Sequence, residues 1–390
     1  MDFPQKPLSQ LLGSNGPVHA VSYSASPGTY ILTGSADRSI RLYNPSPSAT
    51  ATTAAGRPSS LSSLPLPEGR LIQTYSAHGY EVLSLAVAVD NKTFVSGGGD
   101  RAVFLWDVST AQTLRRFGSS AHGHSGRINA VAFGGAGDSL VVSAGLDTTV
   151  RVWDTKSGGA GANKPVQVLA NARDAVTSLV VGGSGGAEII AGSVDGRVRS
   201  YDVRMGRVTT DVLGASVTSL CMARDAKTML VGSLDSKVRL LDRSTGACLR
   251  TYADAGWRNE ELRVQSVLGG KERFVVAGDE MTTAAAAAKD APSSHMPTAK
   301  ITTPAVTATA DKNEGRLWAW DLLTGKLVAK IAVPWGGIGG TDSRKRIVGR
   351  DGVEKARKNV VSCLAWKEGG FGNQFCVGGT SGVVTVFGES

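Results

Sequence analysis

The sequence predicts an all-β protein made of seven repeated units, each a small four-stranded sheet, that stack around a common axis. Three observations support this prediction. A short pattern recurs along most of the 390 residues, glycine is abundant with 49 residues, and the apolar segments are short and separated by turn residues. Glycine at this density, without a collagen period, indicates many tight turns and therefore many short strands.

The recurring pattern is a turn aspartate followed, six residues later, by a mostly aromatic position at the end of the next apolar run. Five pairs have this spacing: Asp37 and Tyr43, Asp100 and Trp106, Asp147 and Trp153, Asp195 and Tyr201, and Asp235 and Leu241. Two degenerate copies follow, at 274–278 with 315–321 and at 375–388. Because one spacing recurs five times, we interpret the units as repeats of one structural motif.

Each unit is expected to contain four strands, which in the third unit are 128–133, 140–143, 150–153 and 166–169. A single sheet of this size cannot cover its own apolar faces, whereas radially stacked sheets each pack on two neighbours. Without three insertions, 306 residues remain, or about 44 per unit, which fits the ~40–45-residue period of a propeller blade. The sequence therefore predicts a single seven-bladed β-propeller over residues 1–390.

The three insertions are 45–69, 281–312 and 332–358. The first is rich in Pro and Ser, the second in Ala and Thr, and the third in Gly and then in Lys and Arg. Such compositions bury too little apolar surface to offset the entropy of ordering, so we expect flexible loops. Successive strands run antiparallel, so the second and third insertions should leave one face of the ring and the first insertion the opposite face.

Closure of the ring needs a strand from the other end of the chain. The last unit has only three strands before Ser390, while a spare apolar segment, 7–12, precedes the first unit. We expect this N-terminal strand to complete the last blade, because an unpaired sheet edge would otherwise be exposed.

Composition restricts the class of protein further. The net charge of +9 is compatible with acidic or nucleic-acid partners but establishes neither. The four cysteines are scattered singly, which predicts reduced thiols rather than disulfides or a zinc site. Residues 1–6 lack the apolar run of a signal peptide, and the longest apolar stretch, 82–89, is too short to cross a membrane. We therefore expect a soluble protein of the cytoplasm and nucleus with no membrane partner.

The repeat resembles the WD40 repeat, including the buried polar network of that family. In WD40 proteins a His before the first strand, a Ser or Thr on the second, an Asp in the next turn and a Trp on the third hydrogen-bond together. The fitting sets are His78, Ser96, Asp100 and Trp106, and His124, Ser143, Asp147 and Trp153. The resemblance implies a structural role for all eight residues. Units four and five keep Asp195 and Asp235 but lack the His, so we expect incomplete networks there.

Longer stretches resemble one group of WD40 proteins, the mitogen-activated protein kinase (MAP kinase) organizers, which are scaffolds also found among pre-mRNA splicing components. These stretches are 78–83, 96–107, 172–174, 191–206 and 233–242. The resemblance implies a non-enzymatic scaffold or adaptor that assembles a MAP kinase signalling module, the spliceosome, or both. It also implies a monomeric propeller that acts within larger protein complexes.

Exposed positions in the loops between strands four and one are candidates for protein binding. Five residues fit by position and chemistry: Tyr80, Glu81, Arg127, Arg173 and Asp174. An alternative function rests on Tyr201-Asp-Val-Arg204, which resembles the WDxR box that docks some WD40 proteins on the cullin-4 ubiquitin-ligase adaptor. Leu241-Asp-Arg243 is a near-match to this box. Under this alternative the protein would be a substrate receptor that uses Arg204.

No catalytic residue, cofactor site or metal site is predicted. The segment 182–186 satisfies G-x-S-x-G, but it lies between two strands, whereas a nucleophile elbow joins a strand to a helix. His122 and His124 have no third metal ligand nearby in sequence. The segment 342–358 carries seven basic residues against three acidic ones. We interpret it as a solvated loop, with charge-driven contact to RNA phosphates or to an acidic partner as the alternative.

Overall fold

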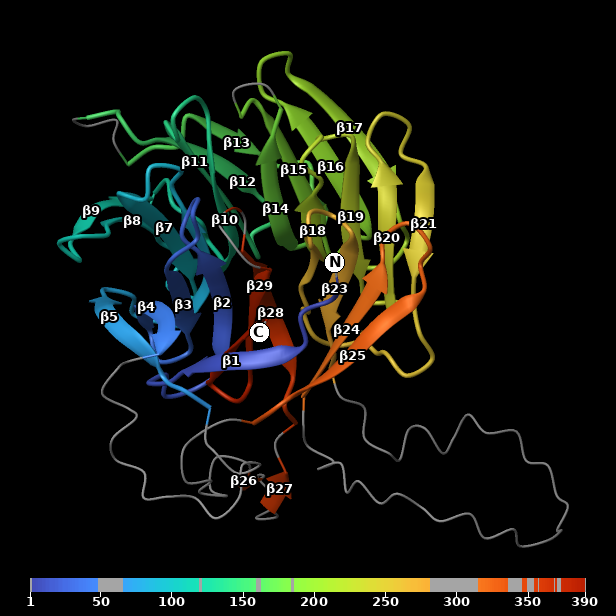
Figure 1. Cartoon of the computed structure of the whole chain (residues 1–390). Coiled ribbons are helices and arrows are strands. Elements are labelled where there is room, and N and C mark those ends of the chain that lie inside the picture. Colours follow the sequence, from blue (N-terminus) through green and yellow to red (C-terminus); the bar gives the residue numbers. More distant parts are fainter. Residues whose placement is uncertain are drawn as a thin grey trace, which may run out of the picture.

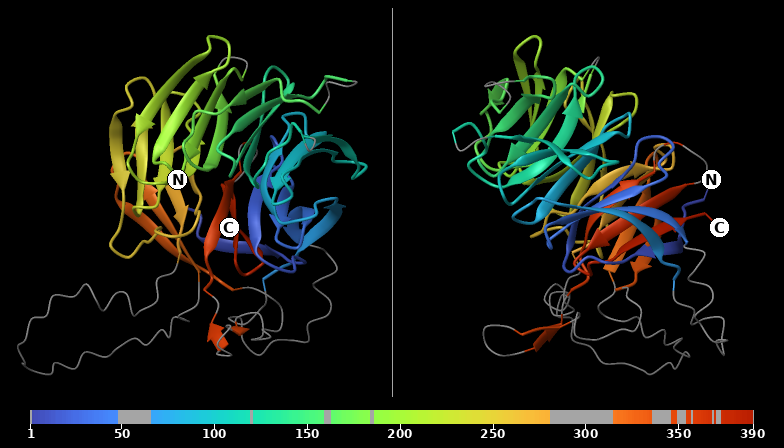
Figure 2. Two further views of the ribbon diagram at one scale, coloured as in Figure 1. Left: turned by 180° about the vertical axis from the view of Figure 1, so that it is seen from behind. Right: turned by 90° about the vertical axis from the view of Figure 1, so that its left-hand side faces the viewer.

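The computed structural model arranges the chain as antiparallel strands around a central axis (Figure 1). It describes residues 2–47, 66–118, 121–158, 163–183, 186–280, 315–335, 346–348, 354–356, 358–367, 369 and 373–389. The strands of these residues form seven four-stranded sheets and one two-stranded hairpin. The views from behind and from the side show the same ring of sheets (Figure 2). The predicted seven-bladed β-propeller is confirmed.

Six blades each consist of four consecutive strands that pair in sequence order. Blade one contains β2 (Val18–Tyr23), β3 (Ile31–Ser35), β4 (Ser39–Pro47) and β5 (Gly69–Ser76). Blade two contains β6 (Val82–Val87), β7 (Thr93–Gly98), β8 (Val103–Asp107) and β9 (Thr113–Phe117). Blade three contains β10 (Ile128–Gly134), β11 (Leu140–Gly145), β12 (Val150–Asp154) and β13 (Gln167–Leu169). Blade four contains β14 (Val176–Gly182), β15 (Glu188–Ser193), β16 (Arg197–Asp202) and β17 (Arg207–Val212). Blade five contains β18 (Val217–Met222), β19 (Thr228–Ser233), β20 (Lys237–Asp242) and β21 (Cys248–Tyr252). Blade six contains β22 (Ser266–Gly269), β23 (Phe274–Gly278), β24 (Gly315–Asp321) and β25 (Leu327–Val333). The strands expected in the third unit match β10–β13 to within two residues.

The seventh blade contains both ends of the described chain. Strands β28 (Val361–Trp366), β29 (Gln374–Gly379) and β30 (Val384–Gly388) pair in order, and β1 (Lys6–Leu11) adds antiparallel to β30. The expected closure by the N-terminal strand is confirmed. The backbone N–H of Gln10 also donates to the carbonyl oxygen of Pro67 at 2.8 Å, so the end of the first insertion borders the free edge of β1.

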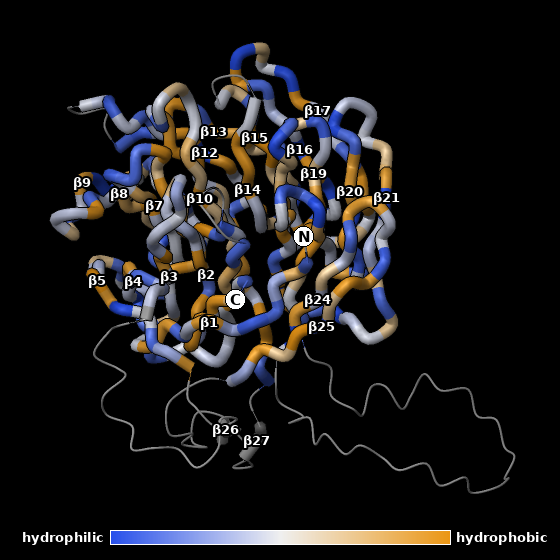
Figure 3. The backbone as a smooth tube through the Cα atoms, in the orientation of Figure 1, coloured by the Kyte–Doolittle hydropathy of each residue, from blue (hydrophilic) through white to orange (hydrophobic). Residues whose placement is uncertain are grey.

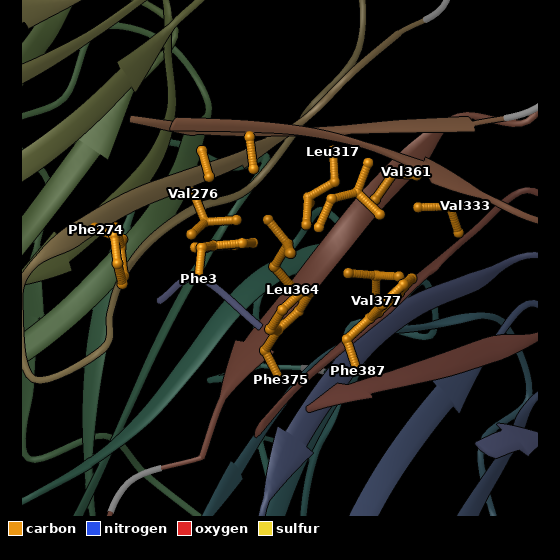
Figure 4. Packing of buried hydrophobic residues seen from close by; sticks show 13 residues of the cluster. Phe3, Phe274, Val276, Leu317, Val333, Val361, Leu364, Phe375, Val377 and Phe387 are labelled. Carbon is orange, nitrogen blue, oxygen red and sulfur yellow. The ribbon is translucent and has the colours of Figure 1, made fainter. Parts of the chain in front are cut away.

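An additional closure contact comes from Phe3, which the sequence analysis did not single out. Its ring packs edge-on against Phe274 of blade six, with 5.1 Å between centroids, and lies 5.6 Å from the ring of Phe375 of blade seven. Figure 4 shows Phe3 within the apolar cluster between these two blades. The N-terminal segment therefore fastens the ring twice, by strand pairing and by an aromatic side chain.

The apolar core is divided among the contacts between neighbouring blades. Between blades two and three, for example, Val95 and Val103 pack against Ile128 and Trp153. Figure 3 shows the hydrophobic residues concentrated along the strands. Close approach at this contact requires a small residue at position 97, since a Cβ on Gly97 would lie 2.6 Å from the Cγ2 atom of Ile128.

The insertions lie mostly outside the described residues, but their ends are placed. Residues 281–312 fall between β23 and β24, as expected. The first insertion joins β4 to β5, as expected, but its predicted bounds are too wide, because 45–47 belong to β4 and residue 69 to β5. The third insertion contains a hairpin of β26 (Arg346–Val348) and β27 (Glu354–Ala356), where only a loop was predicted.

Candidate functional site

One face of the ring is formed by the loops between strands four and one together with the turns between strands two and three; we call it the top face. Backbone hydrogen bonds join the two kinds of segment. Gly99 donates to Glu81 at 2.9 Å, Leu146 to Arg127 at 2.8 Å, and Val194 to Ala175 at 2.9 Å. The same bonding pattern in three successive blades confirms that these loops share one face.

The two polar networks expected from the His, Ser, Asp and Trp sets are present below this face. In blade two, His78 bonds through Nδ1 to Asp100 at 2.8 Å and through Nε2 to Ser96 at 2.7 Å, and the Trp106 indole donates to Ser96 at 2.8 Å. In blade three the equivalent distances are 2.9, 2.8 and 2.8 Å. Every buried group has a partner, as a buried network requires.

These networks hold the turn carboxylates in the ionised form. Burial by itself would raise the pKa of Asp147, but hydrogen bonds from His124, the backbone N–H of Ser125 and Thr149 outweigh it and lower this pKa to about 2. The pKa of Asp100 is also lowered, where the bond from His78 overcomes burial. The carboxylates thereby fix the turns that build the top face.

The expectation of incomplete networks in blades four and five is wrong. Arg199 pairs with Asp195 at 2.6 Å and bonds to Ser193, and Arg239 pairs with Asp235 in the same way. Blade one repeats this arrangement with Arg41 and Asp37 at 2.8 Å. In each case the arginine lies four residues after the aspartate on strand three, so its guanidinium reaches the Ser and Asp that the histidine reaches elsewhere.

The five protein-binding candidates lie together on the top face, in three successive loops. Tyr80 is 63 % exposed, and Arg127, Arg173 and Asp174 are exposed, while Glu81 is half-buried. Arg204 is separate from them. It is exposed in the turn between β16 and β17, where the Asp202 carboxylate accepts its backbone N–H, and turns of this kind lie on the opposite face.

A β-bulge near the start of strand one recurs around the central channel of the top face. The pairing register shifts there in six of the seven blades, directly after the first buried residue of the strand. In blades three and four the residue at the bulge links to the next blade, since the Asn129 amide donates to Val176 at 2.8 Å and the Thr177 hydroxyl to Val217 at 2.6 Å. Bulges re-aim side chains. Residues at four of the bulges line the cavity at the centre of the ring: His19, Leu83, Asn129 and Ser362.

The mouth of this channel is a cavity of about 330 Å³. Its lining joins residues far apart in sequence, among them His19, Glu81, Arg127, Asn129, Arg263 and Gln265. Two of the candidates, Glu81 and Arg127, therefore contribute to it, whereas Tyr80, Arg173 and Asp174 lie outside its lining. His19 and Arg263 were not predicted from the sequence. Arg263 occupies the same repeat position as Glu81 and Arg127, because each lies directly before a buried valine or isoleucine and three residues before a small residue, and that register could have identified it.

The described residues show no other chemical centre. No group of three or more His, Cys, Asp and Glu side chains among them is placed to hold a metal ion. No helix of the length and hydrophobicity needed to cross a membrane occurs in the described residues. Residues 184–185, at the centre of the G-x-S-x-G match, and most of the basic segment 342–358 lie outside the described residues.

Comparisons with known proteins place this geometry in a family. The model of the WD domain, G-beta repeat, matches residues 5–44, 69–107 and 114–154. WD repeat domain-containing protein 83 of Homo sapiens is 39 % identical over 279 residues, which cover 72 % of this chain and 78 % of the human protein. The protein of the same name in Danio rerio is 33 % identical over 318 residues, covering 82 % and 79 %, and the Dictyostelium discoideum homolog is 28 % identical over 295 residues, covering 69 % and 81 %.

The chain belongs to the WD repeat domain-containing protein 83 family of WD40-repeat proteins. Its sequence repeats and its blades are offset by one strand, since the first match begins at β1 of blade seven and ends with β4 of blade one. Each family repeat thus contains strand four of one blade and strands one to three of the next. This offset explains why the N-terminal strand closes the ring.

Proposed function

We propose that this WD40 protein is a non-enzymatic scaffold that brings two or more proteins together on its top face. The observation that carries the proposal is the convergence of exposed aromatic and charged side chains in three successive loops, with Tyr80 the largest of them. Tyr and Arg are enriched among residues that dominate protein interfaces. A rigid ring also fixes the spacing between bound partners, which raises their effective concentration for each other.

The partners proposed are a MAP kinase and the kinase that activates it, or components of the spliceosome. The support is the sequence resemblance to MAP kinase organizers together with membership of the family of WD repeat domain-containing protein 83. On this proposal the protein is a monomer within larger complexes and acts in the cytoplasm and the nucleus.

The test measures whether purified protein holds two kinases at once. Sedimentation of the protein with a MAP kinase and its activating kinase should show a ternary complex, and the double variant Tyr80→Ala/Arg173→Glu should lose it. Arg204→Ala, on the opposite face, is the matched control and should keep it. Binding of spliceosomal proteins but of neither kinase would favour the splicing role, and binding of neither set would contradict the proposal.

A ubiquitin-ligase receptor is the second candidate, and one observation favours it. Arg204 of the WDxR-like box is exposed, with the neighbouring Met205 78 % exposed. The near-match offers no comparable group, because Arg243 pairs with Glu188 and bonds to the Ala226 carbonyl. If this function holds, Arg204→Ala abolishes binding to the cullin-4 adaptor. Arg243→Ala destabilises the protein but keeps this binding, because Arg243 is not part of the docking surface.

A further inference from the structure

Arg263 crosses the central channel of the propeller. It precedes β22 of blade six, and its Nη1 atom donates to the backbone carbonyl oxygen of Asn129 in blade three at 2.7 Å. Blades three and six lie on opposite sides of the ring. The guanidinium therefore stands in the channel, where it lines both the 330 Å³ mouth and a smaller cavity of about 170 Å³ beneath it.

No carboxylate of the described residues forms an ion pair with this cation. Among the described residues, no carboxylate oxygen lies within 4.0 Å of the Arg263 guanidinium, and its buried Nε atom has no hydrogen-bond partner. Burial and the nearby Arg127 guanidinium lower the pKa of Arg263 to about 10, so its surroundings disfavour positive charge. Arg263 is half-buried as a residue and its Nε atom is buried, and cations withdrawn from water are ordinarily paired.

The channel beneath Arg263 offers hydroxyl donors. At the repeat position of Ser84, the third residue of β6, every blade has a small residue, and four of the seven are serines: Ser84, Ser178, Ser219 and Ser266. Ser219 and Ser266 bond to each other at 2.8 Å. Ser178 is only 5 % exposed, and its hydroxyl has no partner among the described residues. Arg263 thus lines both cavities, and Ser178, whose buried hydroxyl has no partner among the described residues, belongs to the lining of the smaller one.

We propose that the central channel binds a small oxyanion of the phosphate class at Arg263, where the two cavities meet. Guanidinium groups bind such oxyanions by paired N–H donation, and serine hydroxyls can donate to the remaining oxygens. Arg127 and His19 supply further positive charge or donors at the mouth, and Glu81 is the one carboxylate in the described lining of the mouth. The oxyanion is either a free ion or a phosphate group carried on a partner's side chain.

This site goes beyond the proposed scaffold function and is tested separately, because ion binding to the purified protein needs no partner. Isothermal titration calorimetry at constant ionic strength, with inorganic phosphate replacing chloride, should show one saturable site. Arg263→Gln should weaken binding by on the order of ten-fold or more, since it removes a charge-assisted bidentate contact. Arg127→Gln should weaken it less. Arg101→Gln, an exposed change in the turn between β7 and β8 on the same face and outside the cavity lining, is the matched control and should bind like the unaltered protein.

Titration with free phosphoserine distinguishes the two sources of the oxyanion. Binding tighter than that of inorganic phosphate supports a phosphate group on a side chain, and weaker binding supports the free ion. If Arg263→Gln does not fold, Arg127→Gln provides the comparison on a folded chain. The proposal is overturned if phosphate shows no saturable binding, or if every variant of Arg263 and Arg127 that folds binds it as tightly as the Arg101→Gln control.

Discussion

At the scale of single residues, the blades provide hydrogen-bond donors to the turn aspartate in two ways. Each turn aspartate needs donors, which come from a histidine before strand one in blades two and three and from an arginine on strand three in blades one, four and five. The sequence identified the histidine sets because their pattern resembles a known network. It could not identify the arginine sets, because the equivalence of Arg199 and His124 depends on where two different segments meet in space.

Replacement of the turn aspartate should cost more in blade three than in blade five. Asp147→Ala leaves His124 and two backbone N–H groups without an acceptor, and its side chain is only 5 % exposed, so we expect a loss of about 1–3 kcal/mol. Asp235→Ala should cost less, because that side chain is 28 % exposed and water can replace it. Urea unfolding of both variants measures the difference, and equal losses would contradict this account.

The ionised carboxylate of Asp147 should also make the stability of the protein fall as the solution becomes acidic. Because the pKa of Asp147 is lowered to about 2 in the folded state from an ordinary value of 3.8, its contribution is complete above about pH 4 and is lost as the pH falls toward 2. Asp147→Asn should therefore reduce the steepness of acid destabilisation in this range. Denaturation midpoints between pH 4.5 and 2.5 measure it; an unchanged slope would show that Asp147 is not held ionised by its network.

At the scale of strands and turns, contacts between blades depend on small residues at defined points. Gly97→Ala should destabilise the protein by about 1–3 kcal/mol, because the new Cβ would lie 2.6 Å from Ile128 and 2.8 Å from Val131 across the blade contact. Gly79→Ala is the matched control, since a Cβ there meets nothing within 4 Å. Thermal unfolding compares the two variants, and equal midpoints would mean that the blades can move apart at no cost.

Loss of the N-terminal strand should open the ring. Deletion of residues 1–12 removes the pairing of β1 with β30 and the packing of Phe3, leaving a free sheet edge and an apolar gap between blades six and seven. We expect a fall of several kcal/mol in unfolding free energy, and about 3 kcal/mol for Phe3→Ala alone. Calorimetry of both proteins gives these values. An unchanged midpoint after the deletion is incompatible with this closure.

The sequence predicted this closure but only half of its mechanism. The strand was predictable because the last unit lacked one and a spare apolar segment preceded the first. Phe3 was not predictable, because one aromatic residue near a terminus belongs to no pattern. The bulges were hidden for a related reason: a shift of register depends on the partner strand, and the residue at each bulge varies from His19 to Leu83 to Asn129.

At the scale of the whole molecule, the repeat places equivalent residues around one axis. The repeat register alone predicted that Tyr80, Glu81, Arg127, Arg173 and Asp174 share a face. It did not predict the channel mouth, because that cavity joins residues from opposite sides of the ring, such as Asn129 and Arg263. Burial lowers the pKa of His19, and so do the guanidinium groups of Arg263 and Arg127, whereas Glu81 acts in the opposite direction. Charged residues from four blades therefore act on one another electrostatically at the channel mouth.

Hydrogen–deuterium exchange of the complex with its partner proteins tests the central claim most directly. If the top face is the assembly surface, partner binding slows exchange in the loops at 77–82, 121–127 and 170–175, and leaves the turn at 203–206 on the opposite face unchanged. Protection confined to 203–206, or to the outer strands, would contradict a scaffold that assembles its partners on the top face.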